Sequence, residues 1–322
     1  MTILVTGGRG LVGSHVIEQL RTAGESVRSF EGDVTDAAAW RSATATGGGI
    51  SAIFHAAAKV AQHLPYAEFE RINVGGTRLA IETAKGTGAR LVHMSSASVY
   101  GRAAGIGAGS GPVAENSPVQ PIAEHDFYAR TKRLAEELVR DSGLPAVAIR
   151  ANVIYGERDP LFTPRVIAVV KRGIFPVIGS GQNHLSCVYV GNVASAIVAA
   201  LVRPVSRFRV YNVTHDAPPA LTQREFIMTF AEVLGVRLFK FPAPAFLARL
   251  GAEAWARWRR FRDPSAYAGL GAAAVSFITG ENPYTDARVQ EELKWTPPFD
   301  TRTAIRRAVA GFGSRGVTSG RS

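Results

Sequence analysis

Short apolar segments alternate with stretches of helical periodicity through the first half of the chain. Between the first two apolar segments, Val16, Ile17 and Leu20 recur on one helical face. Strands are predicted at residues 2–6, 26–30, 50–55, 90–94 and 145–149. This alternation predicts an α/β protein with a doubly wound parallel sheet of the Rossmann type, and the chain length leaves room for a smaller C-terminal lobe.

A glycine-rich turn joins the first predicted strand to the first helix. Gly8, Gly10 and Gly13 fit the pattern G-x-G-x-x-G, and Gly7, Gly10 and Gly13 fit G-x-x-G-x-x-G. Glycines let the backbone turn tightly and approach a pyrophosphate, which then rests on the first amides of the helix. The turn therefore predicts a dinucleotide cofactor.

Acidic residues follow the second predicted strand. Glu31 lies roughly 20 residues beyond the glycines, where a carboxylate can bind the adenosine ribose hydroxyls and favour NAD. Arg9 and Arg28 could instead surround a 2′-phosphate, so NADP stays possible. Asp33 could bind the adenine edge, whereas Asp36 is expected to cap the next helix.

Tyr128 and Lys132 lie four residues apart in a helix predicted over 128–140, so they share a face. A nearby ammonium should favour the phenolate and lower the tyrosine pKa from about 10 toward the working pH. An isolated Tyr-x-x-x-Lys is more often an ordinary amphipathic helix with a solvated lysine. The glycine turn upstream favours a catalytic pair.

Composition limits the remaining possibilities. With 322 residues, 46% of them hydrophobic, the chain can build a large core. The net charge of +11 would permit phosphate binding, but no nucleic-acid reading element is present, so no such partner is expected. The single cysteine, Cys187, excludes an intramolecular disulfide, and no metal site is expected. Without a leader or an apolar run of about 18 residues, a cytoplasmic protein with no membrane span is expected.

Five motifs stand in the order typical of one protein family. They are TGGRGLVG at 6–13, HAAA at 55–58, NVGGT at 73–77, SSASVYG at 95–101 and YARTK at 128–132. Together they resemble the extended short-chain dehydrogenase/reductases of the NAD-dependent epimerase/dehydratase superfamily, over residues 2–312. The resemblance implies catalytic roles for Ser96, Tyr128 and Lys132, with hydride transfer to or from a nicotinamide, and it implies a homodimer.

The same resemblance assigns binding residues. The implied cofactor contacts are Gly7, Arg9, Gly10, Leu11, Val12, Gly13, Glu31, Asp33, Val34, Ala56, Ala57, Ala58, Asn73, Tyr128, Lys132, Asn152 and Val153. The implied contacts of a small-molecule substrate are Ser96, Ser98, Asn152 and Leu185.

The downstream half indicates the substrate class. Residues 149–156 and 173–179 are similar to the 3β-hydroxysteroid and sterol dehydrogenase branch of the superfamily. Leu185 stands where nucleotide-sugar epimerases and dehydratases carry an arginine for the diphosphate, and a leucine cannot form that pair. An apolar substrate such as a sterol, a steroid or a long-chain ketone is therefore predicted. The alternatives are a nucleotide-sugar 4-epimerase or dehydratase with tightly bound NAD, and a non-catalytic cofactor sensor, against which the intact Ser96, Tyr128 and Lys132 argue.

The expected domain limits follow from these motifs. Residues 1–165 should form the dinucleotide-binding domain, with 186–215 returning to it. Residues 166–185 and 216–312 should form the substrate-binding lobe and closing helix, and 313–322 a disordered tail. Within the lobe, the aromatic and arginine-rich stretch 241–262 allows two interpretations: a lid with peripheral membrane contact, or an amphipathic helix packed on the lobe. The second is favoured because such helices usually face the core.

Overall fold

The structure, a computed structural model, describes residues 2–45, 49–60, 64–101, 111–262 and 272–313. Apart from Gly313, the predicted tail lies outside these residues. The chain divides into two units. The first comprises Met1–Asn152, Val190–Thr214 and Pro283–Pro297, and the second comprises Val153–Tyr189, His215–Asn282 and Pro298–Ser322.

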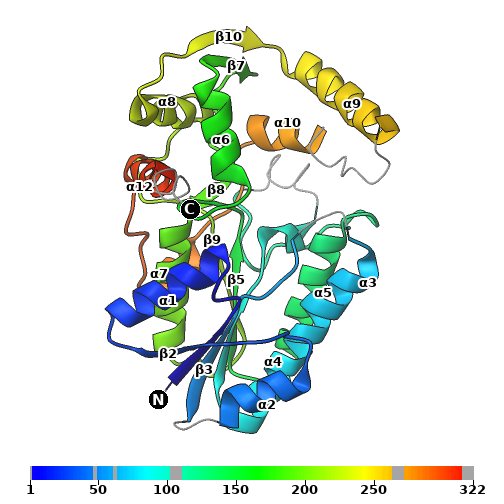
Figure 1. Cartoon of the computed structure of the whole chain (residues 1–322), viewed down its shortest axis with the longest axis vertical. Coiled ribbons are helices and arrows are strands. Elements are labelled where there is room, and N and C mark those ends of the chain that lie inside the picture. Colours follow the sequence, from blue (N-terminus) through cyan, green and yellow to red (C-terminus); the bar gives the residue numbers. More distant parts are fainter. Residues whose placement is uncertain (1, 46–48, 61–63, 102–110, 263–271, 314–322) are drawn as a thin grey trace, which may run out of the picture. The chain divides into compact units, whose positions relative to one another are not determined.

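A six-stranded parallel sheet forms the centre of the first unit (Figure 1). Its order is β2-β1-β3-β4-β5-β9, and its strands are β1 (Thr2–Thr6), β2 (Ser26–Ser29), β3 (Ile50–His55), β4 (Arg90–Met94), β5 (Ala146–Ala151) and β9 (Arg209–Val213). The order reverses between β1 and β3, and in such sheets ligands bind beyond the carboxyl ends of the strands at this point. The predicted doubly wound Rossmann sheet is confirmed.

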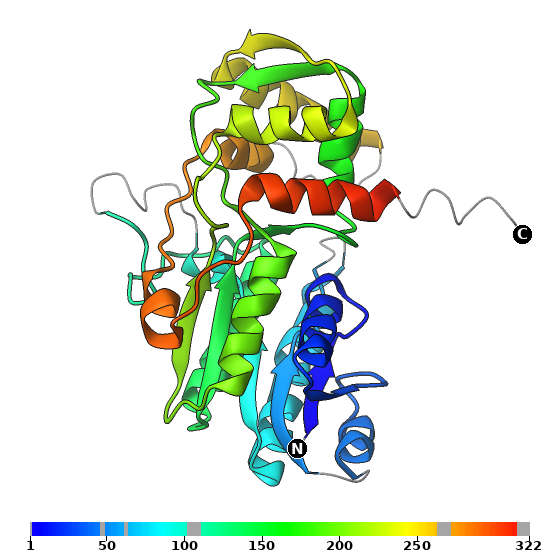
Figure 2. The same cartoon turned by 90° about the vertical axis from the view of Figure 1, so that its left-hand side faces the viewer.

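Helices cover both faces of this sheet (Figure 2). On one face α1 (Leu11–Thr22) packs against α7 (Val190–Val202). On the other, α4 (Gly76–Thr87) packs against α2 (Ala37–Ala45) and α5 (Phe127–Asp141). The unit also contains α3 (Tyr66–Phe69), a π-helical turn (Glu70–Gly75), a 3-10 helix (Ala97–Tyr100) and α11 (Ala287–Leu293).

The link from β2 to α2 is short, and no strand of the described residues lies beyond β2. Within this link Val34 is buried, and its carbonyl accepts a hydrogen bond from the Trp40 indole at 2.8 Å. Phe30 packs on Trp40 with ring centroids 4.6 Å apart. These contacts belong to the core beside α4, so the short link between β2 and α2 is packed into the first unit.

The second unit contains two small parallel sheets and the remaining helices. The sheets pair β6 (Val153–Tyr155) with β8 (Cys187–Tyr189), and β7 (Ile174–Ile178) with β10 (Phe239–Ala243). The helices are α6 (Phe162–Lys171), α8 (Gln223–Leu234), α9 (Ala245–Arg262), α10 (Ala272–Thr279) and α12 (Thr301–Gly313). No described helix is both long enough and apolar enough to cross a bilayer.

Two limits of the units differ from the expected domains. The first unit ends at Asn152 instead of residue 165, because β6 pairs with β8 outside the main sheet. The first unit also takes in Pro283–Pro297, where α11 packs against β9 and α7. The preference for a core-facing helix at 241–262 is wrong for the large side chains of α9. Leu250, Trp258 and Phe261 are 60%, 53% and 89% exposed.

Candidate active site

The glycine turn between β1 and α1 is packed against the end of β3. Gly7 has a φ of +67°, and a Cβ added there would lie 2.9 Å from the Ala57 nitrogen. A Cβ on Gly13 would lie 2.2 Å from the Gly7 carbonyl oxygen. The Thr6 hydroxyl accepts hydrogen bonds from the Ala56 and Ala57 amides, each at 3.1 Å. Only glycine fits at Gly7 and Gly13, and the first strand, the turn and Ala56–Ala57 form one rigid surface.

The start of α1 is open to an anion. Gly10 is its N-cap and offers no side chain to the first amides, and the first turn carries no acidic residue. Leu11 and Val12 are half-buried, while Arg9 is exposed. The N-terminal amides and the helix dipole of such a turn favour a phosphate. The residues that the sequence suggests for a pyrophosphate therefore fit that group.

The acidic residues after β2 take different roles. Glu31 is exposed, just past the strand end. Asp33 accepts hydrogen bonds from the Thr35 amide and hydroxyl, each at 2.9 Å, and the Thr35 amide contributes most to lowering the Asp33 pKa. Asp36 accepts from the Ala38 amide at 2.8 Å, which confirms the predicted cap of α2.

Arg28 is held away from a role in phosphate binding. Its guanidinium donates to the carbonyl oxygen of Ala43 on α2 at 2.7 Å. Of the two arginines considered for a 2′-phosphate, this leaves the exposed Arg9. The geometry thus favours the ribose-binding interpretation of Glu31 over a phosphate pocket at the end of β2.

Ser96, Tyr128 and Lys132 come from two neighbouring elements. Ser96 follows β4 and caps the 3-10 helix, accepting the Ser98 amide at 3.2 Å. Tyr128 and Lys132 lie one turn apart on α5, whose N-cap Asp126 accepts the Ala129 amide at 3.1 Å. Burial raises the pKa of Tyr128, and a hydrogen bond with the Ser96 hydroxyl opposes that rise. The structure therefore brings Ser96 and Tyr128 together.

The sequence-based expectation for the tyrosine pKa is wrong in this structure. The pKa of Tyr128 lies above its ordinary value, because burial and the Asp126 carboxylate both favour the neutral phenol. Lys132 is not among the groups that shift it. Instead, the Lys132 ammonium donates to the Met94 carbonyl oxygen at the end of β4. Tyr128 keeps partial exposure, which moderates the effect of burial.

Lys132 itself is strongly perturbed. Its side chain is 3% exposed, and burial lowers its pKa to about 8, against the opposing attraction of Glu136. An ammonium with that pKa can lose and regain a proton near neutral pH.

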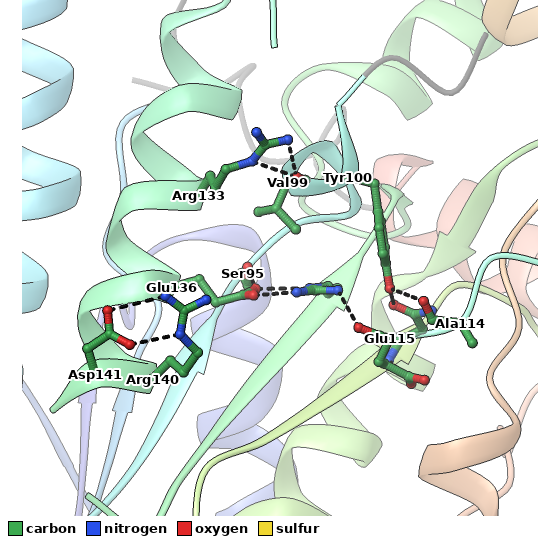
Figure 3. Close-up of polar contacts among 11 residues, drawn as sticks. Ser95, Val99, Tyr100, Ala114, Glu115, Arg133, Glu136, Arg140 and Asp141 are labelled. Carbon is green, nitrogen blue, oxygen red and sulfur yellow. Dashed lines mark hydrogen bonds and ion pairs between the residues drawn. The ribbon is translucent and has the colours of Figure 1, made fainter. Parts of the chain in front are cut away.

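A buried polar network lies around Glu136, one turn beyond Lys132 on α5, and Figure 3 shows Glu136 with Ser95 and Tyr100. Glu136 accepts hydrogen bonds from Ser95 at 2.5 Å and from Arg150 at 2.5 and 3.0 Å. The Arg150 guanidinium lies 4.6 Å from the Tyr100 ring centroid, and the Tyr100 hydroxyl donates to Asn212 at 2.8 Å. The sequence analysis missed Glu136 and Arg150. The signal for Glu136 was its spacing, four residues beyond Lys132 on the same helical face.

Two buried histidines also lie near Lys132. His55, the last residue of β3, pairs with His93, the last but one of β4, and their rings stack with centroids 5.8 Å apart. His55 Nδ1 lies 3.0 Å from the Thr6 hydroxyl. Burial, followed by the Lys132 charge, lowers the pKa of His55 to about 3. The neutral ring fits the structural role expected for a histidine at a strand end.

Asn73 links two parts of the site. It lies in the π-helical turn, where its side-chain oxygen accepts the Lys59 amide at 2.7 Å. Its amide nitrogen donates to the Lys59 carbonyl at 3.2 Å and to the Thr131 hydroxyl at 3.1 Å. Because Thr131 precedes Lys132, Asn73 fixes the chain after Ala58 against the helix that carries the tyrosine and the lysine.

The remaining predicted residues fall in both units. Asn152 directly follows β5 and is the last residue of the first unit's N-terminal segment. Its side-chain amide donates to the Thr214 carbonyl oxygen at 3.2 Å. The Ser98 hydroxyl is buried and has no hydrogen-bond partner among the residues that the structure describes. Val153 and Leu185 belong to the second unit, and both are half-buried. The residue before Leu185, His184, binds Glu281: the carboxylate accepts the His184 amide at 3.1 and 3.2 Å and lies 2.5 Å from the His184 ring.

Comparison with known families agrees with this geometry. The sequence profile of the NAD dependent epimerase/dehydratase family matches residues 3–214. The chain belongs to this family. As the motifs implied, it is an NAD-dependent enzyme of the extended short-chain dehydrogenase/reductase type, and the glycine turn fits the cofactor that the family name gives.

Similar proteins include a ketoreductase and a sterol dehydrogenase. A 4-hydroxy-2-methyl-3-oxo-4-farnesyl-3,4-dihydroquinoline-1-oxide ketoreductase of Stigmatella aurantiaca is 28% identical, over 91% of each chain. A decarboxylating sterol-4-alpha-carboxylate 3-dehydrogenase of Mus musculus is 30% identical over 66% of this chain. The match spans 64% of the mouse protein, slightly under two thirds of its length.

Solved structures share the fold. The UDP-glucose 4-epimerase of Thermus thermophilus in complex with NAD is similar with a TM-score of 0.67 and 23% identity, over 97% of this chain and 99% of the epimerase. At that identity the likeness shows the fold alone.

Proposed function

We propose that this family member interconverts a hydroxyl and a ketone on an apolar substrate such as a sterol, a steroid or a long-chain ketone. The association of Ser96 with Tyr128, one turn from Lys132, supports the chemistry. When bound, a nicotinamide dinucleotide supplies the hydride acceptor or donor. The glycine turn would bind its pyrophosphate, and Glu31 would bind its adenosine ribose. Ala56–Ala58 and Asn73 would contact the cofactor beyond the strand ends.

The roles of the three catalytic residues follow from their groups. Tyr128 moves the proton of the reacting oxygen, Ser96 orients that oxygen, and Lys132 holds the ribose and contributes positive charge. Because burial raises the Tyr128 pKa, the phenol is protonated at neutral pH and is a proton donor. A resting donor suits ketone reduction, whereas alcohol oxidation would first require the phenolate.

The residues around position 185 indicate which class of substrate the chain binds. A diphosphate needs cations, and at this position the chain offers a leucine. The preceding residue, His184, is already bound to the Glu281 carboxylate through its amide and its ring, so an apolar group is the better fit. The names of the two relatives, a ketoreductase whose named compound carries a farnesyl group and a sterol dehydrogenase, support the same class of apolar substrate.

A second candidate is a nucleotide-sugar 4-epimerase or dehydratase with tightly bound NAD. The observation in its favour is the fold shared with the Thermus thermophilus epimerase. Leu185 argues against it, as described above.

One assay separates the two functions. The purified chain is incubated with NAD or NADP and a panel containing a 3β-hydroxysteroid, a long-chain secondary alcohol and UDP-glucose. The reduced nicotinamide is followed by absorbance, and the sugar is analysed for epimerisation. Steady formation of the reduced nicotinamide with an apolar alcohol as substrate supports the proposal. An unchanged absorbance together with an epimerised sugar would overturn it in favour of the epimerase.

The homodimer and the cytoplasmic location remain predictions. Light scattering with size-exclusion chromatography tests the first, since a dimer of a 34.3 kDa chain doubles the mass. Fractionation of cells that express the chain tests the second.

A further inference from the structure

Exposed apolar side chains gather in one segment of the second unit. Eight of the 14 large apolar residues that are exposed in the described structure lie between residues 239 and 262. They are Phe239, Phe241, Phe246, Leu247, Leu250, Trp255, Trp258 and Phe261. A monomeric soluble protein rarely exposes a contiguous group of this kind without a binding role.

The helix α9 has its small residues on one side and its large residues on the other. Ala245, Ala248, Ala252 and Ala256 recur every three or four residues and are half-buried or buried. Leu247, Leu250, Ala254, Trp258 and Phe261 recur with the same period and are exposed. The two stripes are offset by two residues along the chain, so they lie about 200° apart around the helix axis. A core-facing helix would bury the large residues, so this helix presents its apolar stripe outward.

The outward stripe lies on a strongly basic helix. Residues Ala245–Arg262 contain five arginines and one glutamate. Arg249, Arg257 and Arg262 are exposed, and the Arg262 guanidinium lies 5.0 Å from the Trp258 ring centroid. Tryptophan and arginine side by side on an amphipathic helix suit the boundary between lipid headgroups and acyl chains, where the ring is buried and the cation meets a phosphate.

We propose that α9 docks on the surface of an anionic lipid bilayer, lying in its plane with Leu247, Leu250, Trp258 and Phe261 among the acyl chains. An 18-residue helix is about 27 Å long, but its arginines exclude a transverse position. A second copy of the chain would bring the same arginines face to face, and each copy carries a net charge of +11. A negatively charged lipid surface complements both the apolar stripe and the charge. Figure 1 shows α9 (yellow) leaving the end of β10, with α10 beside it.

The natural tryptophans report on this helix. Of the four, Trp40 and Trp295 are 2% and 6% exposed, whereas Trp255 and Trp258 are 47% and 53% exposed, both on α9. Adding vesicles of phosphatidylcholine with phosphatidylglycerol to the full chain should shift the emission to shorter wavelength, and brominated acyl chains should quench it. Sedimentation with the same vesicles should retain the protein, with weaker binding at high salt and with phosphatidylcholine alone.

A double variant tests the stripe itself. L250E with F261E should lower the vesicle partition coefficient by about tenfold or more, since each change removes an inserted apolar group and adds a repelled charge. The matched control is V119E with V202E, which makes the same charge change at two residues that are 50% and 46% exposed outside the segment. It should retain most of the binding.

The proposal is independent of the enzyme's substrate, because vesicle binding is measured without turnover. Wild-type protein that stays in the supernatant of anionic vesicles with unchanged tryptophan emission would overturn it. So would a concentration-dependent dimer in which the blue shift occurs without lipid, since a second copy would then cover α9.

Discussion

Arg150 and Glu136 form a hydrogen-bonded ion pair whose Nη2–Oε1 distance is 2.5 Å, with both side chains less than 10% exposed. Removing one member leaves the other charge buried without compensation. R150M should therefore lower the free energy of unfolding by about 3–5 kcal/mol, measured by urea denaturation.

Two further variants identify the charge as the cause. In R150M with E136Q, the amide keeps a partner for Ser95 and removes the carboxylate charge, so about half or more of the loss should be recovered. R140M breaks the exposed pair with Asp141, which is also drawn in Figure 3, and should change stability little. Equal losses in R150M and in the double variant would contradict this account.

Stability should also depend on the charge of Lys132. Its folded pKa of about 8 lies below the ordinary 10.5, so between these values the folded state has lost a proton that the unfolded state keeps. The cost of the buried ammonium is fully present below about pH 8 and is relieved as the pH rises. The free energy of unfolding of the wild type, relative to K132M, should therefore rise by about 1.4 kcal/mol per pH unit in this window.

The comparison with K132M cancels the titration of other groups. K85M, which removes an exposed lysine on α4, is the matched lysine-to-methionine control and is measured over the same pH range. A flat difference between the wild type and K132M would mean that Lys132 is not desolvated as the structure indicates.

The glycine turn should tolerate no side chain. G13A would place its Cβ 2.2 Å from the Gly7 carbonyl, so the turn must move and NAD affinity should fall by at least about tenfold. G86A adds a Cβ on α4 with nothing within 4 Å and should leave the affinity unchanged. Isothermal titration with NAD measures both, and circular dichroism checks the fold. Wild-type affinity in G13A would show that the turn does not cradle the cofactor.

Y128F tests the proposed proton transfer. The variant keeps the ring and removes the hydroxyl that interacts with Ser96, so turnover should fall by about 10²–10⁴-fold. NAD affinity should change little, because the glycine turn and Glu31 are untouched. Y66F on α3 is a control that removes a tyrosine hydroxyl outside the proposed catalytic set. Normal turnover in Y128F would refute the mechanism.

How far sequence reasoning reaches can be seen in particular residues. Strands at 2–6, 50–55 and 90–94 have the predicted limits, because a buried parallel strand is an uninterrupted apolar run between turn residues. The helix with Tyr128 and Lys132 was found from its period. The pKa of Tyr128 was not, because its largest cause is burial, which only the folded chain produces. Arg150 lies 14 residues from Glu136 on a different element, so no local pattern reveals the pair. The outward face of α9 was missed because amphipathicity shows that a helix has two sides, but the size of the residues on each stripe decides which side faces the protein.

The substrate class can be tested at Leu185 by restoring the cation that nucleotide-sugar enzymes of the superfamily carry. L185R adds a guanidinium one residue after His184, which holds the Glu281 carboxylate, and this carboxylate can compete with a diphosphate for the new charge. Activity on an apolar ketone should fall, because a charge replaces an apolar contact, and UDP-glucose should not become a substrate. L185R with E281Q removes the competing carboxylate, so it is the stricter test. A large gain on UDP-glucose in this double variant, with epimerised product, would mean that the chain retains a nucleotide-sugar site and that its apolar specificity depends on these two residues alone.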